Sequence, residues 1–210
     1  MLDHPPTRLN IALHNERAVI MPLTAASERE LIHTRQVVCR GYRRSDGFWD
    51  VEGHLIDTKS YRWKSDYRGD VPPGVPVHEM WLRLTIDDDF FIHGAEASSD
   101  FHPFRVCPEV TPNFAALKGL RIGPGWRRKL KELVGGTKGC THLVELLAPL
   151  ATAAYQTIYP IREKKRREEN QLDPHKKPEL IDTCHALASD SEVVERYWPD
   201  FYTGKAAAKG

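Results

Sequence analysis

The sequence predicts an α+β fold, a small antiparallel sheet with helices packed on one face. Between about residues 36 and 96, apolar side chains alternate with polar ones, which is the pattern of half-buried β-strands. Beyond Cys107 the apolar residues recur at helical spacing instead. Strands and helices are therefore segregated along the chain, and this order is typical of an α+β domain.

The composition is that of a soluble globular protein. Hydrophobic residues make up 40% of the 210 residues, and charged residues make up 28%. The 30 Lys and Arg residues nearly balance the 29 Asp and Glu residues, and a net charge of +1 argues against a dedicated nucleic-acid-binding protein. No apolar run approaches the ~20 residues that a membrane helix needs. The first residues lack the pattern of a secretory signal, so we expect a cytoplasmic protein. From the charge balance and the short apolar runs we expect it to bind neither nucleic acids nor membranes.

The first hairpin is expected over residues 36–57. Its strands flank Asp46-Gly47, a dipeptide typical of tight turns because glycine accepts a positive φ. In the second strand the apolar side chains share one face, and Asp50, Glu52 and His54 share the other. Such a face is most often wet, but these three side chains are also typical of a pocket. The sequence leaves both interpretations open.

A second hairpin is expected from residues 77–87 and 90–96, which are joined by three aspartates at 87–89. This triplet predicts a turn and not a calcium loop, because the further spaced oxygen ligands and the glycine of such a loop are missing. Residues 61–76, which are rich in glycine, proline and charge, are expected to form a loop or flap.

Helices are expected over residues 111–120 and 126–134, and the longest helix opens at Cys140 with Thr141 as its N-cap. The apolar stripe of this helix is predicted to be Leu143, Leu146, Leu147, Leu150, Ala154 and Ile158. The whole chain is expected to divide into an N-terminal extension (1–34, with helical turns over 27–33), an α+β core domain (35–160), a charged linker (161–178), a C-terminal helix packing on the core (179–200) and a disordered tail (201–210).

Cysteine and histidine side chains are the strongest candidates for chemistry. Cys140 is expected at the start of a helix, where free N–H groups and a partial positive charge favour the thiolate. His142 follows two residues later, and His78 opens the cleanest strand. The cysteines are far apart, no CxxC pair exists, and in a cytoplasm we expect all of them reduced: Cys39, Cys107, Cys140 and Cys184.

The first interpretation of these residues is a metal site. Thiolates and neutral imidazoles together suit zinc or iron. The expected ligands are His78, Cys107 and Cys140, with His142 or Glu79 completing the set. The partner would then be a metal ion or a small molecule bound at it.

Two other interpretations stay open. A metal-independent enzyme could act on a small organic substrate, with Cys140 as a nucleophile activated by His142 or His78 and with His54 and Asp50 as acid–base groups. A non-catalytic binding module could present its tryptophans to a partner. The sequence does not decide whether Cys184 and His185 join the site, and it leaves a homo-oligomer open.

Two stretches resemble the iron–sulfur cluster scaffold family. MWLRLTID (80–87) is similar to the first core strand of that family, and GCTHLVELLAPLATAA (139–154) is similar to its final cysteine and the helix that follows. The resemblance covers about residues 77–160 and implies an iron–sulfur-scaffold-like core. It also implies that Cys107 and Cys140 take the places of two ligand cysteines, and that His78 takes the place of a ligand aspartate.

The sequence departs from this family at two other site positions. Pro76 stands where the family has its earliest ligand cysteine, and Gly139 precedes the last cysteine in place of the usual histidine. The resemblance therefore implies a retained site geometry with other chemistry rather than cluster assembly itself.

A closer resemblance extends over nearly the whole chain. Four motifs are similar to the bacterial family catalogued as domain of unknown function 2889: DGFWDVEGHLIDTK (46–59), HEMWLRLTIDD (78–88), GCTHLVELL (139–147) and DTCHAL (182–187). This resemblance implies a fold grouping and supplies no activity.

Overall fold

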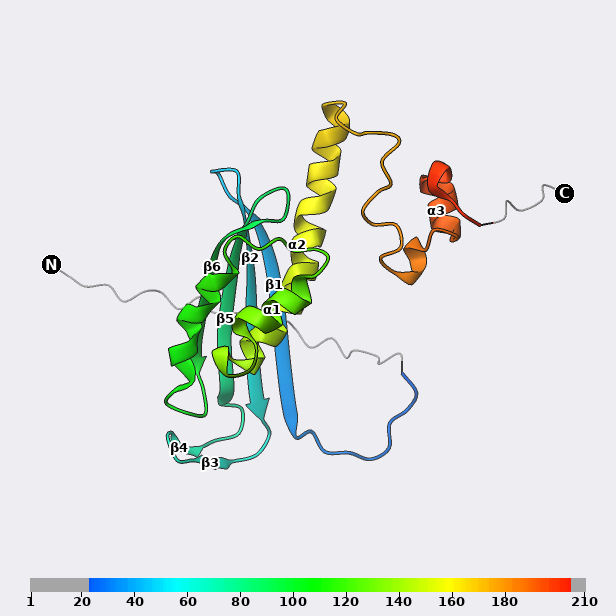
Figure 1. Cartoon of the computed structure of the whole chain (residues 1–210). Helices are drawn as coiled ribbons and strands as arrows, with labels where there is room; N and C mark the ends of the chain where they lie inside the picture. Colours follow the sequence, from blue (N-terminus) through cyan, green and yellow to red (C-terminus); the bar gives the residue numbers. More distant parts are fainter. Residues whose placement is uncertain (1–22, 205–210) are drawn as a thin grey trace.

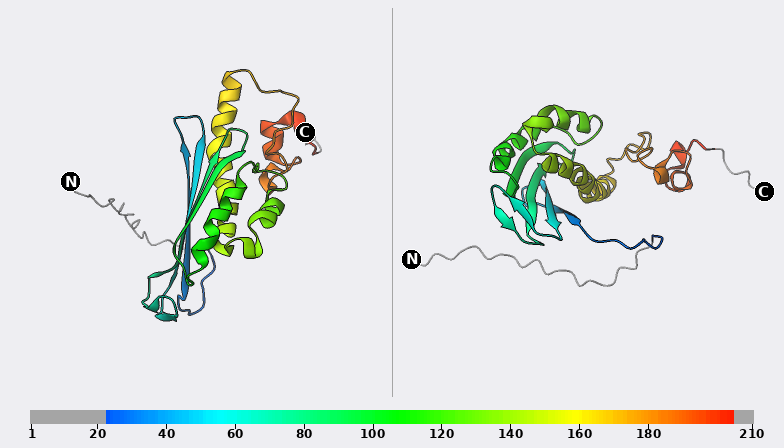
Figure 2. Two further views of the ribbon diagram at one scale, coloured as in Figure 1. Left: turned by 60° about the vertical axis from the view of Figure 1, so that its left-hand side comes forward. Right: turned by 90° about the horizontal axis from the view of Figure 1, so that it is seen from below.

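The computed structural model describes residues 23–204 and confirms the α+β class (Figure 1). Four strands form one antiparallel sheet in the order β1-β2-β5-β6. These strands are β1 (His33–Arg43), β2 (Trp49–Lys59), β5 (Pro76–Ile86) and β6 (Ile92–Phe101). The helices lie on one face of this sheet (Figure 2).

Both expected hairpin turns are confirmed. Gly47 adopts a φ of 91° between β1 and β2, which are paired along their whole length. The three aspartates join β5 to β6, and the Asp87 carboxylate accepts hydrogen bonds from the backbone N–H groups of Asp89 and Phe91. A carboxylate that closes its own turn in this way explains the triplet without a bound cation.

The chain after β6 is helical. It begins with the 3₁₀-helix η1, and the long helix α2 is the last element of the core. The elements are η1 (Cys107–Leu117), α1 (Trp126–Val134), the single turn η2 (Gly136–Lys138) and α2 (Thr141–Glu168). The expected apolar stripe of α2 is confirmed, since all six of its members are buried. The N-cap of α2 is Cys140 rather than Thr141.

The core lies between the sheet and α2. On β2 the buried side chains Trp49, Val51 and Leu55 all point towards the helices. Gly53 lies among them and lets the helix approach closely, because a Cβ atom at this position would lie 3.0 Å from the Leu146 side chain and 3.1 Å from that of Leu150. The start of α2 is thereby held against the centre of the sheet.

Three segments in or next to the core domain differ from their expected structure. Residues 27–32 form no helix, and β1 begins at His33. Residues 61–76 carry a small hairpin of β3 (Trp63–Ser65) and β4 (Gly69–Val71) rather than a loop throughout. Helix α2 continues past residue 160 to Glu168, because the charges of this stretch pair along the helix, as in Lys164–Glu168 at 3.9 Å.

The expected C-terminal helix over 179–200 is broken into short turns. It contains η3 (His185–Leu187), α3 (Glu192–Tyr197) and η4 (Pro199–Phe201). Ser191 caps α3 by accepting a hydrogen bond from the backbone N–H of Val194. Residues 1–22 of the expected extension and 205–210 of the expected tail lie outside the described part of the chain.

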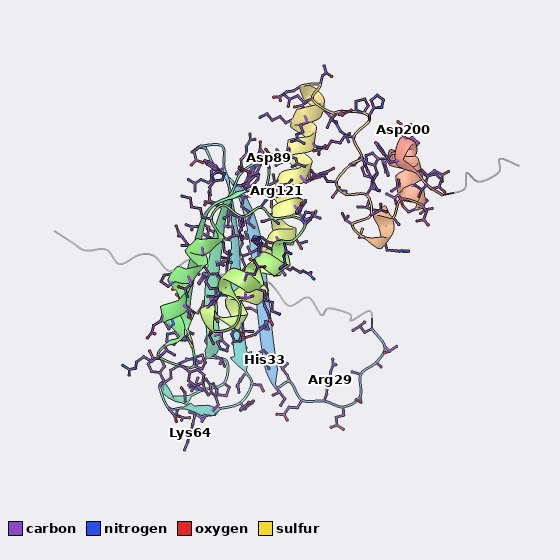
Figure 3. The ribbon with its side chains drawn as sticks, in the orientation of Figure 1. Arg29, His33, Lys64, Asp89, Arg121 and Asp200 are labelled. Carbon is purple, nitrogen blue, oxygen red and sulfur yellow. The ribbon has the colours of Figure 1, made fainter. Side chains whose placement is uncertain are left out.

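Labelled residues identify the two ends of the sheet (Figure 3). His33 marks the end where β1 begins and β2 ends, and Asp89 marks the opposite end, where β5 turns into β6 (Figure 3). The β3–β4 hairpin lies at the His33 end, as Lys64 indicates (Figure 3).

Over residues 23–204, no helix combines the length and the apolar character that crossing a membrane requires.

Candidate functional site

A row of polar side chains crosses three neighbouring strands at the His33 end of the sheet. Asp57 on β2 is paired with Arg35 on β1 and with His78 on β5. Because side chains of directly paired residues lie on the same face of a sheet, all three project together. Asp57 lies an even number of residues from Val51 and Leu55, so its side chain is on the same face of β2. This is the face that the helices cover.

Asp57 is the centre of the row. Its side chain is 2% exposed, and its carboxylate accepts two hydrogen bonds from Arg35, 2.7 Å from Nε to Oδ1 and 2.8 Å from Nη2 to Oδ2. His78 Nδ1 lies 3.1 Å from Oδ2, and His33 Nε2 lies 3.3 Å from Oδ1. A buried carboxylate needs such partners, because burial of an unpaired charge is strongly unfavourable.

Helix α2 places a second histidine over this row. His142, in the first turn of α2, brings Nε2 to 3.8 Å from Asp57 Oδ2. Its ring lies against that of His78, with 3.8 Å between the ring centroids. One ligand atom from each of Asp57, His78 and His142 lies within 4.8 Å of the other two.

Cys140 lies beside this group at the N-cap of α2. Its Sγ is 3.7 Å from His142 Nδ1 and 3.8 Å from the sulfur of Met80. Gly139 sets this position, since a Cβ atom there would overlap the carbonyl oxygen of Val134. A glycine is therefore required next to Cys140.

The charges of the group act on one another. Burial and the neighbouring His142 ring lower the pKa of His78 to about 4. Burial and the Arg35 charge lower the pKa of His142. Burial alone would raise the pKa of Asp57, but the hydrogen bonds and charge of Arg35 outweigh it, and the pKa is lowered. At neutral pH the site therefore holds one carboxylate and two neutral imidazoles.

Three of the residues singled out from the sequence come together at this place: His78, Cys140 and His142. Cys107 begins η1, after the end of β6, and it does not belong to the group of close ligand atoms. Cys184 and His185 lie at η3 in the C-terminal segment and are outside that group as well. The expected ligand set of His78, Cys107 and Cys140 thus differs from the set that the fold brings together.

His54 and Asp50 project from the opposite face of β2. The His54 ring stacks on Trp81 at 3.5 Å, and its Nε2 lies 3.1 Å from Glu79. Asp50 accepts a hydrogen bond from the Thr85 hydroxyl at 2.7 Å. The strand alternation that grouped these residues also separates them from Cys140 and His142, because the sheet lies between the two faces.

Sequence reasoning overlooked Asp57, Arg35 and His33 as site residues. The signal for Asp57 was present, since it continues the alternation of Trp49, Val51 and Leu55 on the apolar face. A carboxylate at such a position is uncommon and needs a partner. Arg35 and His33 carry no comparable signal, because the register that pairs β1 with β2 is not visible in the sequence.

Comparison with known proteins identifies the family. The profile of the family described as a protein of unknown function (DUF2889) matches residues 33–156, which include all the side chains of the site from His33 to His142. No curated protein and no solved structure matches the chain significantly, so the resemblance to iron–sulfur scaffolds stays a prediction. The match spans more than half of the chain, and this protein therefore belongs to the DUF2889 family.

Proposed function

We propose that Asp57, His78 and His142 hold a single zinc or iron ion. The observation that carries this proposal is the convergence of three ligand atoms within 4.8 Å of one another. Two imidazoles and one carboxylate are the ligand set of many catalytic zinc sites and of non-haem iron(II) sites. Oxygen and nitrogen donors favour such an ion over an iron–sulfur cluster, which thiolates hold in most proteins.

The distances fit an ion placed between the side chains. Ligand atoms about 2.1 Å from a tetrahedral ion stand about 3.4 Å from each other. The Asp57 Oδ2 atom lies 3.1 Å from His78 Nδ1 and 3.8 Å from His142 Nε2, on either side of that value. Small side-chain rotations would bring all three atoms to an ion.

Arg35 is compatible with this role. A carboxylate oxygen can accept more than one interaction, so the hydrogen bonds from Arg35 leave Asp57 able to coordinate an ion. The positive charge of Arg35 is offset by Glu145, whose Oε2 lies 3.2 Å from Nη1. Arg35 would then fix the orientation of the ligand carboxylate, as hydrogen-bonded neighbours of metal ligands commonly do.

Three protein ligands would leave a coordination position for water or substrate. An ion in such a position supplies Lewis-acid chemistry and lowers the pKa of a bound water molecule. The two imidazoles suit this role because their lowered pKa values keep them neutral and able to bind at neutral pH. We therefore infer a metal-dependent activity on a small molecule.

Elemental analysis of protein purified without a metal-binding tag tests the proposal. We expect about one zinc or iron ion per chain, and we expect a strong chelator to remove it and lower the melting temperature. His78→Ala and His142→Ala should each lose the ion. His93→Ala is the matched control, because His93 also pairs with an aspartate, Asp87 at 2.7 Å, but it lies outside the site. A wild-type protein that is metal-free and takes up neither zinc nor iron would refute the proposal.

A second candidate is a thiol nucleophile, which the position of Cys140 favours. Cys140 Sγ faces His142 Nδ1 at 3.7 Å, and the other nitrogen of that ring faces Asp57 at 3.8 Å. A thiol, an imidazole base and an orienting carboxylate in this order form the arrangement of a cysteine hydrolase. Cys140 is also the N-cap of the 28-residue helix α2, so its sulfur lies at the positive end of the helix dipole.

Alkylation resolved by mass spectrometry separates the two candidates. A nucleophilic Cys140 should react with iodoacetamide faster than Cys39, whose pKa burial raises. His142→Ala should slow the reaction of Cys140 and leave that of Cys39 unchanged. Equal, slow labelling of both thiols in metal-free protein would exclude the nucleophile.

A further inference from the structure

A groove of about 370 Å³ lies between α1 and the first turns of α2. Its walls are largely apolar, with Trp126 and Leu130 from α1 and Val144 and Ala148 from α2. Helix α1 lies beside the N-terminal part of α2 on the covered face of the sheet (Figure 1). The volume is within the range of small-molecule pockets.

We propose that this groove binds an amphiphilic carboxylate, that is, an apolar chain or ring that ends in a carboxylate group. The apolar walls account for the chain, and the cations that line the groove account for the carboxylate. A medium-chain fatty acid is the simplest molecule of this class.

Two cations that line the groove have no ion-pair partner in the described part of the chain. Arg127 and Lys131 line the groove one helical turn apart on α1, and neither forms an ion pair with any residue from 23 to 204. The adjacent cations differ, since Arg128 and Lys129 lie 3.8 Å and 3.5 Å from the Glu132 carboxylate. The free positive charge on α1 is thus gathered on the side that faces the groove.

Trp126 adds an independent observation. Its side chain borders the groove and is 6% exposed, yet its Nε1 donor has no hydrogen-bond acceptor in the described part of the chain. A buried donor without an acceptor is uncommon and unfavourable. A ligand oxygen that enters the groove would supply the missing acceptor.

Glu145 connects the groove to the proposed metal site. It lines the groove, and it contacts Arg35, which in turn holds Asp57. The Glu145 carboxylate is drawn to Arg35 at 3.2 Å, and Arg127 and Lys131 outnumber it among the charged residues that line the groove. The identification of the groove as the substrate pocket of the metal site rests on the proposed function, whereas ligand binding in the groove does not.

Calorimetric titration of the metal-free full chain with decanoate tests the proposal. We expect saturable one-to-one binding of decanoate, no binding of acetate, which lacks the chain, and weaker binding of decyltrimethylammonium, which reverses the charge. Removing both cations in an R127A/K131A double variant should weaken decanoate binding about tenfold. Ala148→Trp, which fills the groove, should abolish it. The R128A/K129A variant is the matched control and should bind like the wild type.

The outcomes separate the two proposals. Decanoate binding that is unchanged in both the R127A/K131A and Ala148→Trp variants would overturn the groove assignment, and equal binding of the cationic amphiphile would overturn the carboxylate class. Circular dichroism of each variant establishes that it is folded. If the protein takes up neither zinc nor iron and still binds decanoate in the groove, the ligand site stands and only its link to a metal centre is refuted.

Discussion

Replacing Asp57 by asparagine tests the charge network at the centre of the site. Asparagine keeps the size of the side chain and removes its charge. Arg35 then loses the charge assistance of its two hydrogen bonds, at 2.7 Å and 2.8 Å, because the single amide oxygen of asparagine can accept only one of them and carries no charge. His78 loses a carboxylate acceptor for Nδ1.

The loss follows from the burial of the two partners. Breaking a fully buried ion pair typically reduces stability by about 3–5 kcal/mol. Asp57 is 2% exposed, but the Arg35 side chain is 35% exposed and can be hydrated after the substitution. We therefore expect a smaller loss, about 2 kcal/mol in the metal-free protein. For a chain of this length, that corresponds to a decrease in melting temperature of roughly 4–8 °C.

Guanidinium denaturation of metal-free protein measures this loss. Asp57→Asn should lower the denaturation midpoint without changing the slope, and a double-mutant cycle with Arg35→Met should give a coupling energy of about 1–2 kcal/mol. Asp70→Asn is the matched control, because Asp70 pairs with Arg62 at 2.7 Å where both side chains are more than half exposed. Its effect should stay within about 0.5 kcal/mol. If Asp57→Asn were as mild as this control, the network would not be the stabilising element described above.

Three further predictions concern titration and packing. Because burial and His142 lower the pKa of His78 from 6.5 to about 4, the unfolded chain takes up this proton at a higher pH than the folded chain. Above pH 6.5 His78 is neutral in both states, and its burial does not depend on pH. As the pH falls from 6.5 through 4, protonation of the unfolded chain should lower the unfolding free energy of the metal-free protein by up to about 3 kcal/mol. The difference in unfolding free energy between pH 7.5 and pH 4.5 should be smaller for His78→Gln than for the wild type. Gly139→Ala should destabilise the protein by about 1–3 kcal/mol and weaken metal binding, since its Cβ would overlap the Val134 carbonyl, whereas Gly123→Ala, which meets only the Arg121 side chain at 3.8 Å, should be nearly neutral. Gly53→Ala should cost a similar 1–3 kcal/mol by pushing α2 away from β2, and an unchanged midpoint would show that the helix can shift freely.

The strands and the long helix could be predicted because their patterns are local. Alternation along β2 and the stripe on α2 are each set by which side chains leave water, and a turn such as Asp46-Gly47 is set by glycine itself. The C-terminal region could not be predicted in the same way. Its charge density predicts a linker where α2 in fact continues, with side chains that pair along the helix, and the residues after it form short turns rather than one helix.

The candidate site could be predicted only in part, because it depends on register. Reasoning from sequence found His78, Cys140 and His142 from their chemistry and their places at element ends. It paired them with Cys107, which the resemblance to the iron–sulfur scaffold family sets at a ligand position. The partner that the fold supplies is Asp57, and the pairing of β2 with β5 that sets it beside His78 follows from the whole ladder rather than from any short motif.

The position of the charged row indicates a role beyond stability. A buried ion pair contributes little to stability compared with apolar side chains of the same size, so its presence in a core is not explained by stability alone. Here the row ends the apolar face of β2, directly below the N-terminus of α2, where His142 and Cys140 are also placed. Any apolar residue at position 57 would continue the core, yet the chain places a carboxylate there and supplies Arg35 to neutralise it. Local departures from the best packing are expected at functional sites, and this is the place where the fold makes one.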